Sequence, residues 1–243
     1  MRTLLLLLLA VRLEGATEYH LVIEQTGNPL VPPRSEATVL VDGANGCERV
    51  DGVTKRLTND GGKTVIALDH QLKTWWVYKP IVPHPLHPVA PKASVRDLLV
   101  KSSDQPTDET FAGFATRKYT IQATYTLVED FYGSKVPAKQ SITISFWTSD
   151  AINGSMPLPP IDLVSGRAEV DAALAPKIAA VPGFPLKTLF VATRAYERGM
   201  PQVEMITATI DAIRNVAAPP HAFERPREYI EQEPVMTAPG VSK

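Results

Sequence analysis

The stretch from Lys118 to Leu127 constrains the fold of this chain more than any other segment. The apolar or aromatic side chains at every second position are Tyr119, Ile121, Ala123, Tyr125 and Leu127. Alternation with a period of two predicts a strand that lays one face on a core and the other in water. Residues 141–146 repeat the pattern, and the link at 133–137 contains glycine, serine and proline. The sequence therefore predicts a long hairpin here.

The other apolar stretches indicate a mainly β (α+β) fold built from antiparallel strands. The predicted strands are residues 19–24, 37–41, 48–57, 64–68, 75–78, 186–193 and 202–213. Asn59-Asp60-Gly61-Gly62 is a predicted hairpin turn, because Asn, Asp and Gly tolerate a positive φ. In the last strand the apolar positions change phase between Met205 and Ile206, which predicts a β-bulge. A bulge bends its strand, so we expect a strongly curved sheet.

Two short helices are predicted among the strands. Ser94 is a candidate N-cap for the first and Ser165 for the second. Their apolar positions are Val95, Leu98 and Leu99 in the first helix and Val170, Ala173, Leu174 and Ile178 in the second. Pro176 should interrupt the second helix, because proline lacks the amide hydrogen and clashes with the preceding turn. Two proline-rich runs, 80–91 and 156–160, should be extended.

A signal peptide is predicted at the N-terminus, over residues 1–16. Arg2 precedes six leucines, Leu4–Leu9, which is the charge and apolar pattern of an export leader. The run is shorter than the roughly 20 apolar residues that cross about 30 Å of hydrocarbon, so no transmembrane span is expected. We therefore expect a periplasmic or secreted protein of the bacterial envelope. Cys47, the only cysteine, stands too far from the leader to carry the lipid of a bacterial lipoprotein and cannot form an intramolecular disulfide.

Composition suits a single β domain over residues 17–231, followed by a flexible tail at 232–243. Hydrophobic residues make up 44% of the chain and charged residues 21%, which is enough apolar material for one core. Nucleic-acid binders usually carry a clear basic excess. The formal net charge here is -1, so no nucleic-acid partner is expected. No run of basic residues suggests docking to anionic lipid headgroups either.

Catalytic and metal-binding motifs are missing from the sequence. It lacks a Gly-x-Ser-x-Gly elbow, a His-Glu-x-x-His pair and a glycine-rich phosphate loop. His84 and His87 come nearest to metal-ligand spacing, but Pro83, Pro85 and Pro88 prevent the helix that would place both on one face. We therefore expect a solvated loop there, with no bound metal, no cofactor and no enzymatic activity. A hydrolase that uses both histidines and an aspartate stays open as an alternative.

The tryptophans bear on the question of a ligand cavity. Trp75 and Trp76 are consecutive in a predicted strand, so they point to opposite faces of the sheet. Trp147 likewise follows Phe146 on the opposite side. One interpretation is structural packing beneath a helix, and the other is an apolar cavity lined by these rings.

Four local motifs occur in a fixed order between Thr17 and Ile230. They are Val65-Ile66-Ala67-Leu68-Asp69 with Lys73-Thr74-Trp75-Trp76-Val77-Tyr78, then Phe111-Ala112-Gly113-Phe114-Ala115-Thr116-Arg117-Lys118-Tyr119, then Gly183-Phe184-Pro185-Leu186, and finally Pro220-His221-Ala222-Phe223-Glu224-Arg225-Pro226-Arg227-Glu228-Tyr229. Together they resemble a group of bacterial envelope proteins, many of unknown function, that share the fold of the lipoprotein carriers LolA and LolB.

The resemblance implies a strongly curved antiparallel sheet, an unclosed barrel, with a few short helices on its concave side. In the carriers, the sheet and its helices enclose an apolar cavity that accepts acyl chains. Such a cavity binds its ligand through burial of apolar surface, worth about 25 cal/mol per Å².

We therefore expect a non-enzymatic envelope protein that binds a lipid, a lipidated protein or another apolar ligand between sheet and helices. The predicted lining residues are Trp75, Trp76, Leu98, Leu99, Tyr119, Ile121, Phe146 and Trp147. The alternative is a protein–protein interaction module, such as an envelope-stress regulator or an assembly scaffold, with a fully packed interior. A continuous apolar cavity under the helices distinguishes the first function from the second.

Overall fold

The computed structural model describes residues 15–29, 32–79, 93–131, 134–152, 156–158, 161, 163 and 165–232. Nearly all of the predicted leader, the proline-rich run at 80–91 with His84 and His87, and the predicted tail after residue 232 lie outside the described residues. Within the described ranges, the chain forms one sheet and one α-helix.

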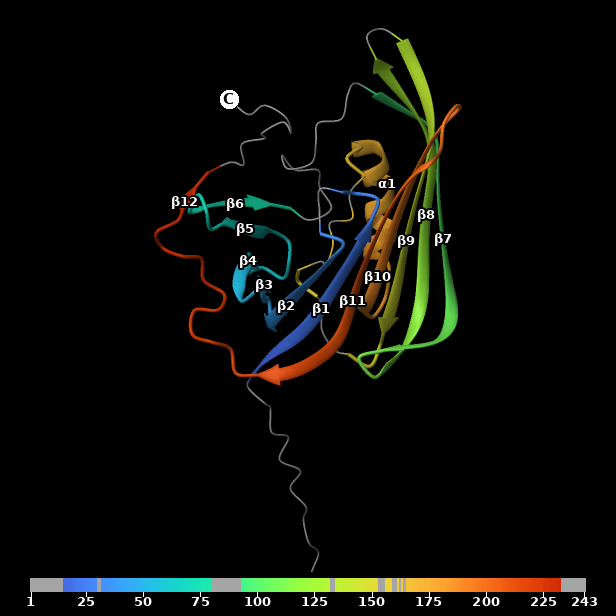
Figure 1. The fold of residues 1–243 in the computed structure, drawn as a ribbon. Coiled ribbons are helices and arrows are strands. Elements are labelled where there is room, and N and C mark those ends of the chain that lie inside the picture. Colours follow the sequence, from blue (N-terminus) through green and yellow to red (C-terminus); the bar gives the residue numbers. More distant parts are fainter. Residues whose placement is uncertain are drawn as a thin grey trace, which may run out of the picture.

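A single 12-stranded sheet contains every strand of the described residues (Figure 1). The strands are β1 (Ala16–Thr26), β2 (Arg34–Asp42), β3 (Asn45–Val50), β4 (Val53–Thr58), β5 (Val65–Asp69), β6 (Thr74–Tyr78), β7 (Ala93–Phe111), β8 (Phe114–Phe131), β9 (Ser134–Ser149), β10 (Phe184–Tyr196), β11 (Gln202–Val216) and β12 (Ile230–Glu231). Across the sheet they follow the order β12-β6-β5-β4-β3-β2-β1-β11-β10-β9-β8-β7. Neighbouring strands are antiparallel, except for the short parallel contact of β12 with β6.

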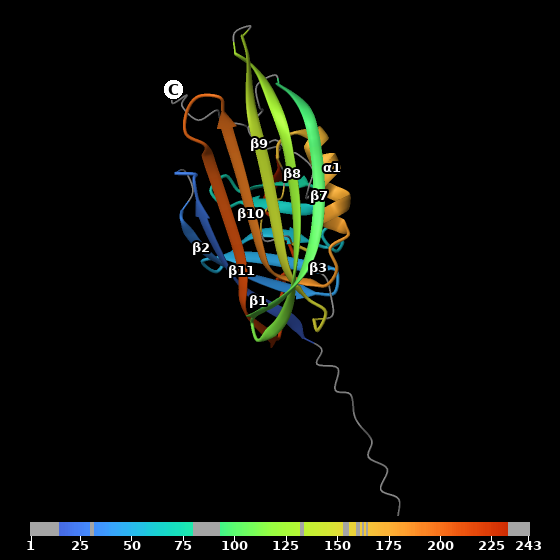
Figure 2. The ribbon, with the colours of Figure 1, turned by 90° about the vertical axis from the view of Figure 1, so that its right-hand side faces the viewer.

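The sheet curves strongly around the helix α1 (Ala168–Ala179). In Figure 1 the long strands β7 to β11 form one wall, the shorter strands β2 to β6 face them, and α1 lies between the two on the concave side. Figure 2 views the long strands from their convex side, with α1 beyond them. The helix packs against β7 and β8. The predicted mainly β fold, with a strongly curved antiparallel sheet, is confirmed; the described residues contain one helix where we expected a few.

The hairpin of β8 and β9 has the faces that the alternation predicts. Ile121 pairs with Ile144, and both side chains are buried on the concave side. Thr120 pairs with Ser145 on the convex side, where their hydroxyl oxygens lie 3.2 Å apart. The buried face of this hairpin belongs to the main apolar core.

The strand predicted over residues 48–57 is in fact two strands, β3 and β4. The chain turns at Asp51 and Gly52, which both have positive φ angles of 52° and 74°. An Asp-Gly pair with positive φ at both positions is typical of a tight hairpin turn. The prediction was wrong because the apolar residues on either side of this turn belong to different strands.

The helix predicted after Ser94 is wrong, because these residues begin the edge strand β7. Val95 and Leu98 are three residues apart, as on one face of a helix, yet both pack against the main core from the strand. The pairing with β8 shifts at this point, and Asp97 has a φ of 54°. The bulge adds one residue to β7 and shifts the alternation of its side chains, so that the apolar positions acquire the spacing of a helix.

The helix predicted after Ser165 is confirmed as α1, with the predicted apolar face. Val170 and Leu174 are fully buried, and Ile178 is partly buried against the same core. The predicted interruption at Pro176 is wrong, because the helix continues to Ala179. Pro176 is exposed, and burial of the opposite face stabilises the helix through this residue.

The bulge predicted in the last long strand lies further along β11 than expected. The register between β10 and β11 is continuous over residues 202–209, and Met205 is an exposed residue of the convex face. The shift occurs at Asp211, opposite the step from His20 to Leu21 in β1. The change of phase at Met205 therefore reflects an apolar side chain exposed on the outer face.

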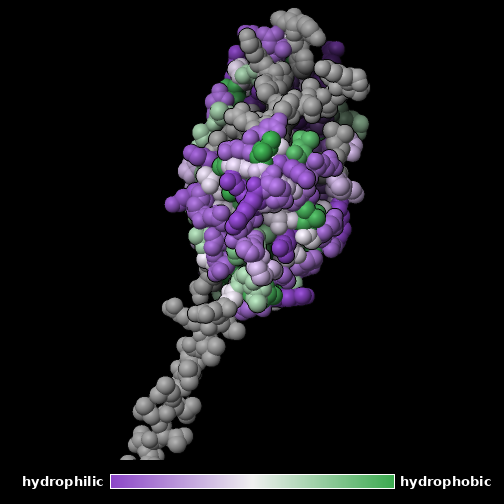
Figure 3. All heavy atoms as spheres, turned by 90° about the vertical axis from the view of Figure 1, so that its left-hand side faces the viewer, coloured by the Kyte–Doolittle hydropathy of each residue, from purple (hydrophilic) through white to green (hydrophobic). Residues whose placement is uncertain are grey.

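A second apolar core lies on the opposite face of β2 to β6. Its buried residues are Ala16, Leu40, Cys47, Leu57, Leu68, Trp75 and Ala222. The segment 217–229, which follows β11, crosses this face and packs Phe223 and Tyr229 against the core. Figure 3 shows this side of the molecule as mostly hydrophilic with scattered hydrophobic spots, so the core is covered.

The turn between β4 and β5 leads to a prediction about acid titration. Asp60 accepts hydrogen bonds from the hydroxyl and the amide of Thr64, at 2.6 and 3.0 Å, and from the hydroxyl of Thr58 at 3.0 Å. These bonds, those of Thr64 most strongly, lower the pKa of Asp60 from 3.8 to about 2. Because the folded pKa is the lower one, the stabilisation is complete above pH 3.8 and is lost as the pH falls through about 2.

An NMR titration of the side-chain carboxyl carbon should therefore give a pKa of about 2 for Asp60. In the variant Thr64→Val the pKa should rise toward 3.8, whereas Thr107→Val, a distant control, should leave it unchanged. A value near 3.8 in the unmodified protein would contradict the prediction.

Candidate functional site

The concave face of the sheet and α1 enclose the main apolar core, and we call their contact region the sheet–helix interface. Its buried sheet residues include Tyr19, Leu21, Val39, Val65, Ile121, Ile144, Phe184, Leu186, Ala208 and Ile210. Leu158, Ile161 and Leu163, which precede the helix, fill the space together with Val170 and Leu174. Burial of apolar surface therefore holds α1 against the concave face.

A buried ion network connects the start of α1 to the sheet. Glu129 lies on the inward face of β8 and is 2% exposed. Its carboxylate pairs with Arg194 of β10 and lies 3.8 Å from a guanidinium nitrogen of Arg167, the N-cap residue of α1. The hydroxyl of Tyr196 donates to the same carboxylate at 3.3 Å. One carboxylate thus joins two strands and the helix.

A second buried carboxylate, that of Asp171, lies in the first turn of α1. One oxygen accepts the amide of Ser165 at 2.6 Å, and the other is buried with no hydrogen-bond partner among the described residues. A negative charge in the first turn interacts favourably with the helix dipole. Burial raises the pKa of Tyr125 beside this network, and the positive charge of Arg167 opposes that effect. The start of the helix is therefore fixed by polar contacts as well as by packing.

A cleft of about 270 Å³ lies at the other end of α1. Its lining residues are Ser102, Ser103 and Asp104 of β7, Tyr119, Thr120 and Ile121 of β8, and Lys177, Ala180 and Val181 at the end of the helix. Arg117 bonds to Asp104 at 2.5 Å and lies over the ring of Tyr119 at 5.9 Å from its centroid. The bond to Asp104 raises the pKa of Arg117. The cleft combines apolar walls with a charged margin.

The structure places the eight predicted lining residues in different environments. Those that pack in the main core are Trp76, Leu98, Tyr119, Ile121 and Phe146. Of these, Tyr119 and Ile121 also line the cleft. Whether any of the five contacts a ligand stays a prediction.

Trp75, Trp147 and Leu99 do not line the sheet–helix interface. The ring of Trp75 is buried in the second core, with the guanidinium of Arg225 at 3.9 Å from its centroid. Trp147 lies on the convex face, where its indole N–H donates to Glu109 at 2.7 Å. Leu99 is 51% exposed. Side chains of neighbouring residues in a strand point to opposite faces of the sheet. Their neighbours Trp76, Phe146 and Leu98 point inward to the main core, so these three side chains point outward.

Glu129, Arg167 and Arg194 are the site residues that sequence reasoning missed. The alternation of β8 continues past Leu127 to Glu129, so the same period-two rule could have identified an inward carboxylate. Its arginine partners lie far along the chain, and nothing in the sequence marks them as counterions.

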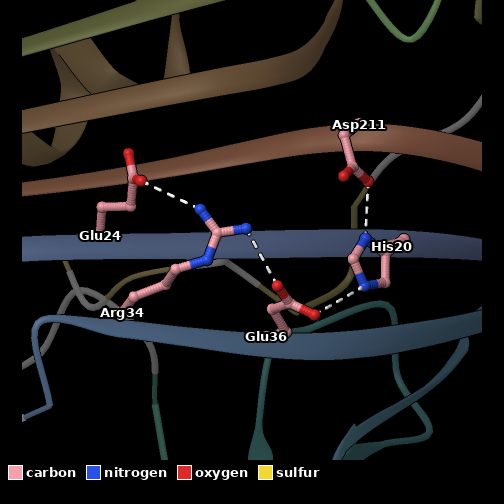
Figure 4. Close-up of polar contacts among 5 residues, drawn as sticks. All are labelled: His20, Glu24, Arg34, Glu36 and Asp211. Atoms are coloured by element: carbon pink, nitrogen blue, oxygen red, sulfur yellow. Dashed lines mark hydrogen bonds and ion pairs between the residues drawn. The ribbon is translucent and has the colours of Figure 1, made fainter.

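A chain of polar contacts crosses β11, β1 and β2 on the convex face (Figure 4). One ring nitrogen of His20 lies 2.6 Å from Asp211, and the other lies 3.7 Å from Glu36. Arg34 extends the chain, at 3.0 Å from Glu36 and 3.2 Å from Glu24. These carboxylates, Glu36 most strongly, raise the pKa of Arg34. The contacts join three adjacent strands.

Two further kinds of site, a metal centre and a membrane-spanning helix, are absent from the part of the chain that the structure describes. It contains no group of three His, Cys, Asp or Glu side chains that could hold a metal ion. No helix in it is long and apolar enough to cross a membrane. The sheet–helix interface offers apolar contact and a charged network at one end.

The fold and the site together define an open, strongly curved β-sheet protein with a helix on its concave face. Among solved structures, the chain is similar to a LolA superfamily protein from Nitrosomonas europaea, at 8% identity and a TM-score of 0.30, with 86% of this chain and 90% of that chain covered. No protein-family model matches the chain, and no curated protein matches it.

Proposed function

We propose that this chain is an exported, non-enzymatic protein of the bacterial envelope that binds an apolar ligand at the sheet–helix interface. A lipid or a lipidated protein is the expected ligand. The leader pattern at residues 1–16 supports export to the periplasm or beyond. The main support for the proposal is the way in which α1 is attached to the sheet. Charged contacts hold the start of the helix, and a cleft opens at its end.

The size of the cleft indicates how a ligand would enter. Ligand pockets commonly measure roughly 300–1,000 Å³. The cleft has about 270 Å³, so a long apolar chain must displace the end of α1 from β7 and β8. The contact of Arg167 with Glu129 would keep the start of the helix in place during this movement. The ligand would then replace apolar contacts of the helix with its own.

Native mass spectrometry, with lipid extraction, of the protein purified from its own envelope tests the proposal. We expect an acyl-chain ligand to co-purify with the protein. A ligand-free protein bound stoichiometrically to a partner protein would contradict the proposal.

A bulky residue in the cleft should exclude the ligand. Ala180 lines the cleft and is exposed, so Ala180→Trp fills the space without disturbing buried side chains. We expect about tenfold less bound ligand per protein, equivalent to ~1.4 kcal/mol. Ala179→Trp is the matched control, since Ala179 is the exposed helix residue next to it and does not line the cleft. Equal ligand content in both variants would argue against entry at the cleft.

One observation favours the alternative of an interaction module with a fully packed interior. Leu158, Ile161 and Leu163 occupy the space between the walls of the sheet, and Leu158 is completely buried. An envelope-stress regulator or an assembly scaffold would keep this packing and bind its partner elsewhere. The same mass-spectrometry experiment distinguishes the two functions, because a packed interior leaves the protein free of lipid.

A further inference from the structure

The convex face of β8 to β10 carries a cluster of charged and aromatic side chains around Trp147. Lys118, Trp147 and Lys187 are cross-strand neighbours on three adjacent strands. Each lysine ammonium lies 4.7 Å from the centroid of the indole ring, and that of Lys187 also lies 5.1 Å from the ring of Phe111. Two positive charges therefore flank one aromatic ring.

The ring between the two lysines is held firmly. Trp147 is 4% exposed, and its indole N–H donates to Glu109 at 2.7 Å. Phe111 contacts the indole edge-on, with the ring centroids 6.3 Å apart. A cation near an aromatic face is attracted to it. Both ammonium groups are thus pre-positioned, which reduces the entropy lost when a ligand binds.

The charge of this cluster is not balanced. Within the residues that the structure describes, Lys118 and Lys187 have no carboxylate partner. Glu109 contacts the indole N–H, so two ammonium groups and one carboxylate leave one positive charge uncompensated. Both lysines are half-buried, where charge interactions are stronger than in bulk water. The cluster therefore favours an additional anion.

We propose that Lys118 and Lys187 form a clamp for a phosphate-type anion on the convex face. The two ammonium nitrogens are at most 9.4 Å apart, twice the 4.7 Å to the shared ring centroid, so both positive charges attract an anion bound at this cluster. Inorganic phosphate and the headgroup of an anionic phospholipid share this chemistry. The two lysines are distant in sequence, which is why no basic run marks the site. The clamp lies on the other face of the sheet from the sheet–helix interface and is independent of the function proposed there.

The clamp can be tested by NMR of the indole N–H signals in the full chain during titration with inorganic phosphate. The absence of a signal in Trp147→Phe assigns the one that belongs to Trp147. We expect a saturable shift of this signal, with an affinity about tenfold weaker in the double variant Lys118→Gln/Lys187→Gln. The control Lys101→Gln/Lys139→Gln removes the same charge from two lysines outside the cluster, both of them exposed, and should leave the affinity unchanged. Lys118→Arg/Lys187→Arg, which keeps both charges, should retain binding.

Vesicles identify the source of the anion. Flotation with phosphatidylglycerol vesicles, compared with phosphatidylcholine vesicles, measures binding to an anionic headgroup. Binding that requires both lysines on these vesicles, without a phosphate response, assigns the clamp to a lipid headgroup; a phosphate response alone assigns it to free phosphate. The proposal is overturned if neither probe binds, or if the control pair weakens binding as much as the clamp pair. Thermal unfolding of each variant confirms that it is folded before comparison.

Discussion

Glu129→Gln should lower the free energy of unfolding by about 3 kcal/mol, near the lower end of the range for breaking a buried ion pair. The substitution preserves the shape of the side chain and removes the negative charge that Arg167 and Arg194 face. The glutamate is 2% exposed, so its partners lose a counterion that water replaces poorly. Arg194 is 29% exposed, which is why we expect the lower end of the range. Urea unfolding monitored by circular dichroism measures the change.

Two further variants test whether the loss of stability comes from the buried ion network. Asp104→Asn breaks the exposed pair with Arg117 and should cost far less, because water screens an ion pair at the surface. Replacing Glu129 by Leu together with Arg167 and Arg194 by Met should recover most of the stability, because apolar side chains of similar volume often substitute for a buried ionic group. Equal costs for Glu129→Gln and Asp104→Asn would refute the role assigned to the network.

Trp75→Ala should cost about 3–5 kcal/mol, as expected when a large buried aromatic side chain is truncated. The ring is 9% exposed and packs in the second core, with Arg225 stacked on it. Its removal leaves a cavity beneath the segment 217–229 and removes the cation–π contact that fastens this segment. Urea unfolding should show the loss of stability, and limited proteolysis should cut within 217–229 faster than in the unmodified protein.

Val77→Ala is the matched control for the tryptophan. Val77 lies two positions further along β6, on the same face of the sheet, and is 48% exposed. Its truncation should change the free energy of unfolding by no more than about 0.5 kcal/mol, as for most surface substitutions. A similar cost in both variants would show that the second core does not depend on the Trp75 ring.

Period-two alternation predicted the strands with regular pairing and failed where the pairing is irregular. It identified the inward face of β8 and β9, because these strands pair without a shift over their whole shared length. At Asp97 the one extra residue of a bulge gave the apolar positions of a strand the spacing of a helix. At Asp51 and Gly52 a tight turn divided one apolar stretch into two strands. The local sequence pattern indicates which face of the sheet a side chain occupies, but it does not indicate which strand lies next to its own.

The candidate site was predictable only in part for the same reason. Sequence reasoning placed Trp75 and Trp76 on opposite faces, which holds, but it could not say which one faces the helix. The covering of Trp75 depends on the segment 217–229, far along the chain. The contacts of Glu129 with Arg194 likewise exist only once β8 and β10 flank β9.

The position of β1 in the sheet sets the order in which the chain can fold. β1 comes first in sequence among the described strands, yet it lies between β2 and β11, so one of its edges stays open until residues 202–216 are available. Pairing between residues so distant in sequence slows folding. An unpaired strand edge is also a template for aggregation. During synthesis β1 thus stays half unpaired, and the chain needs protection from self-association until β11 is available to pair with it.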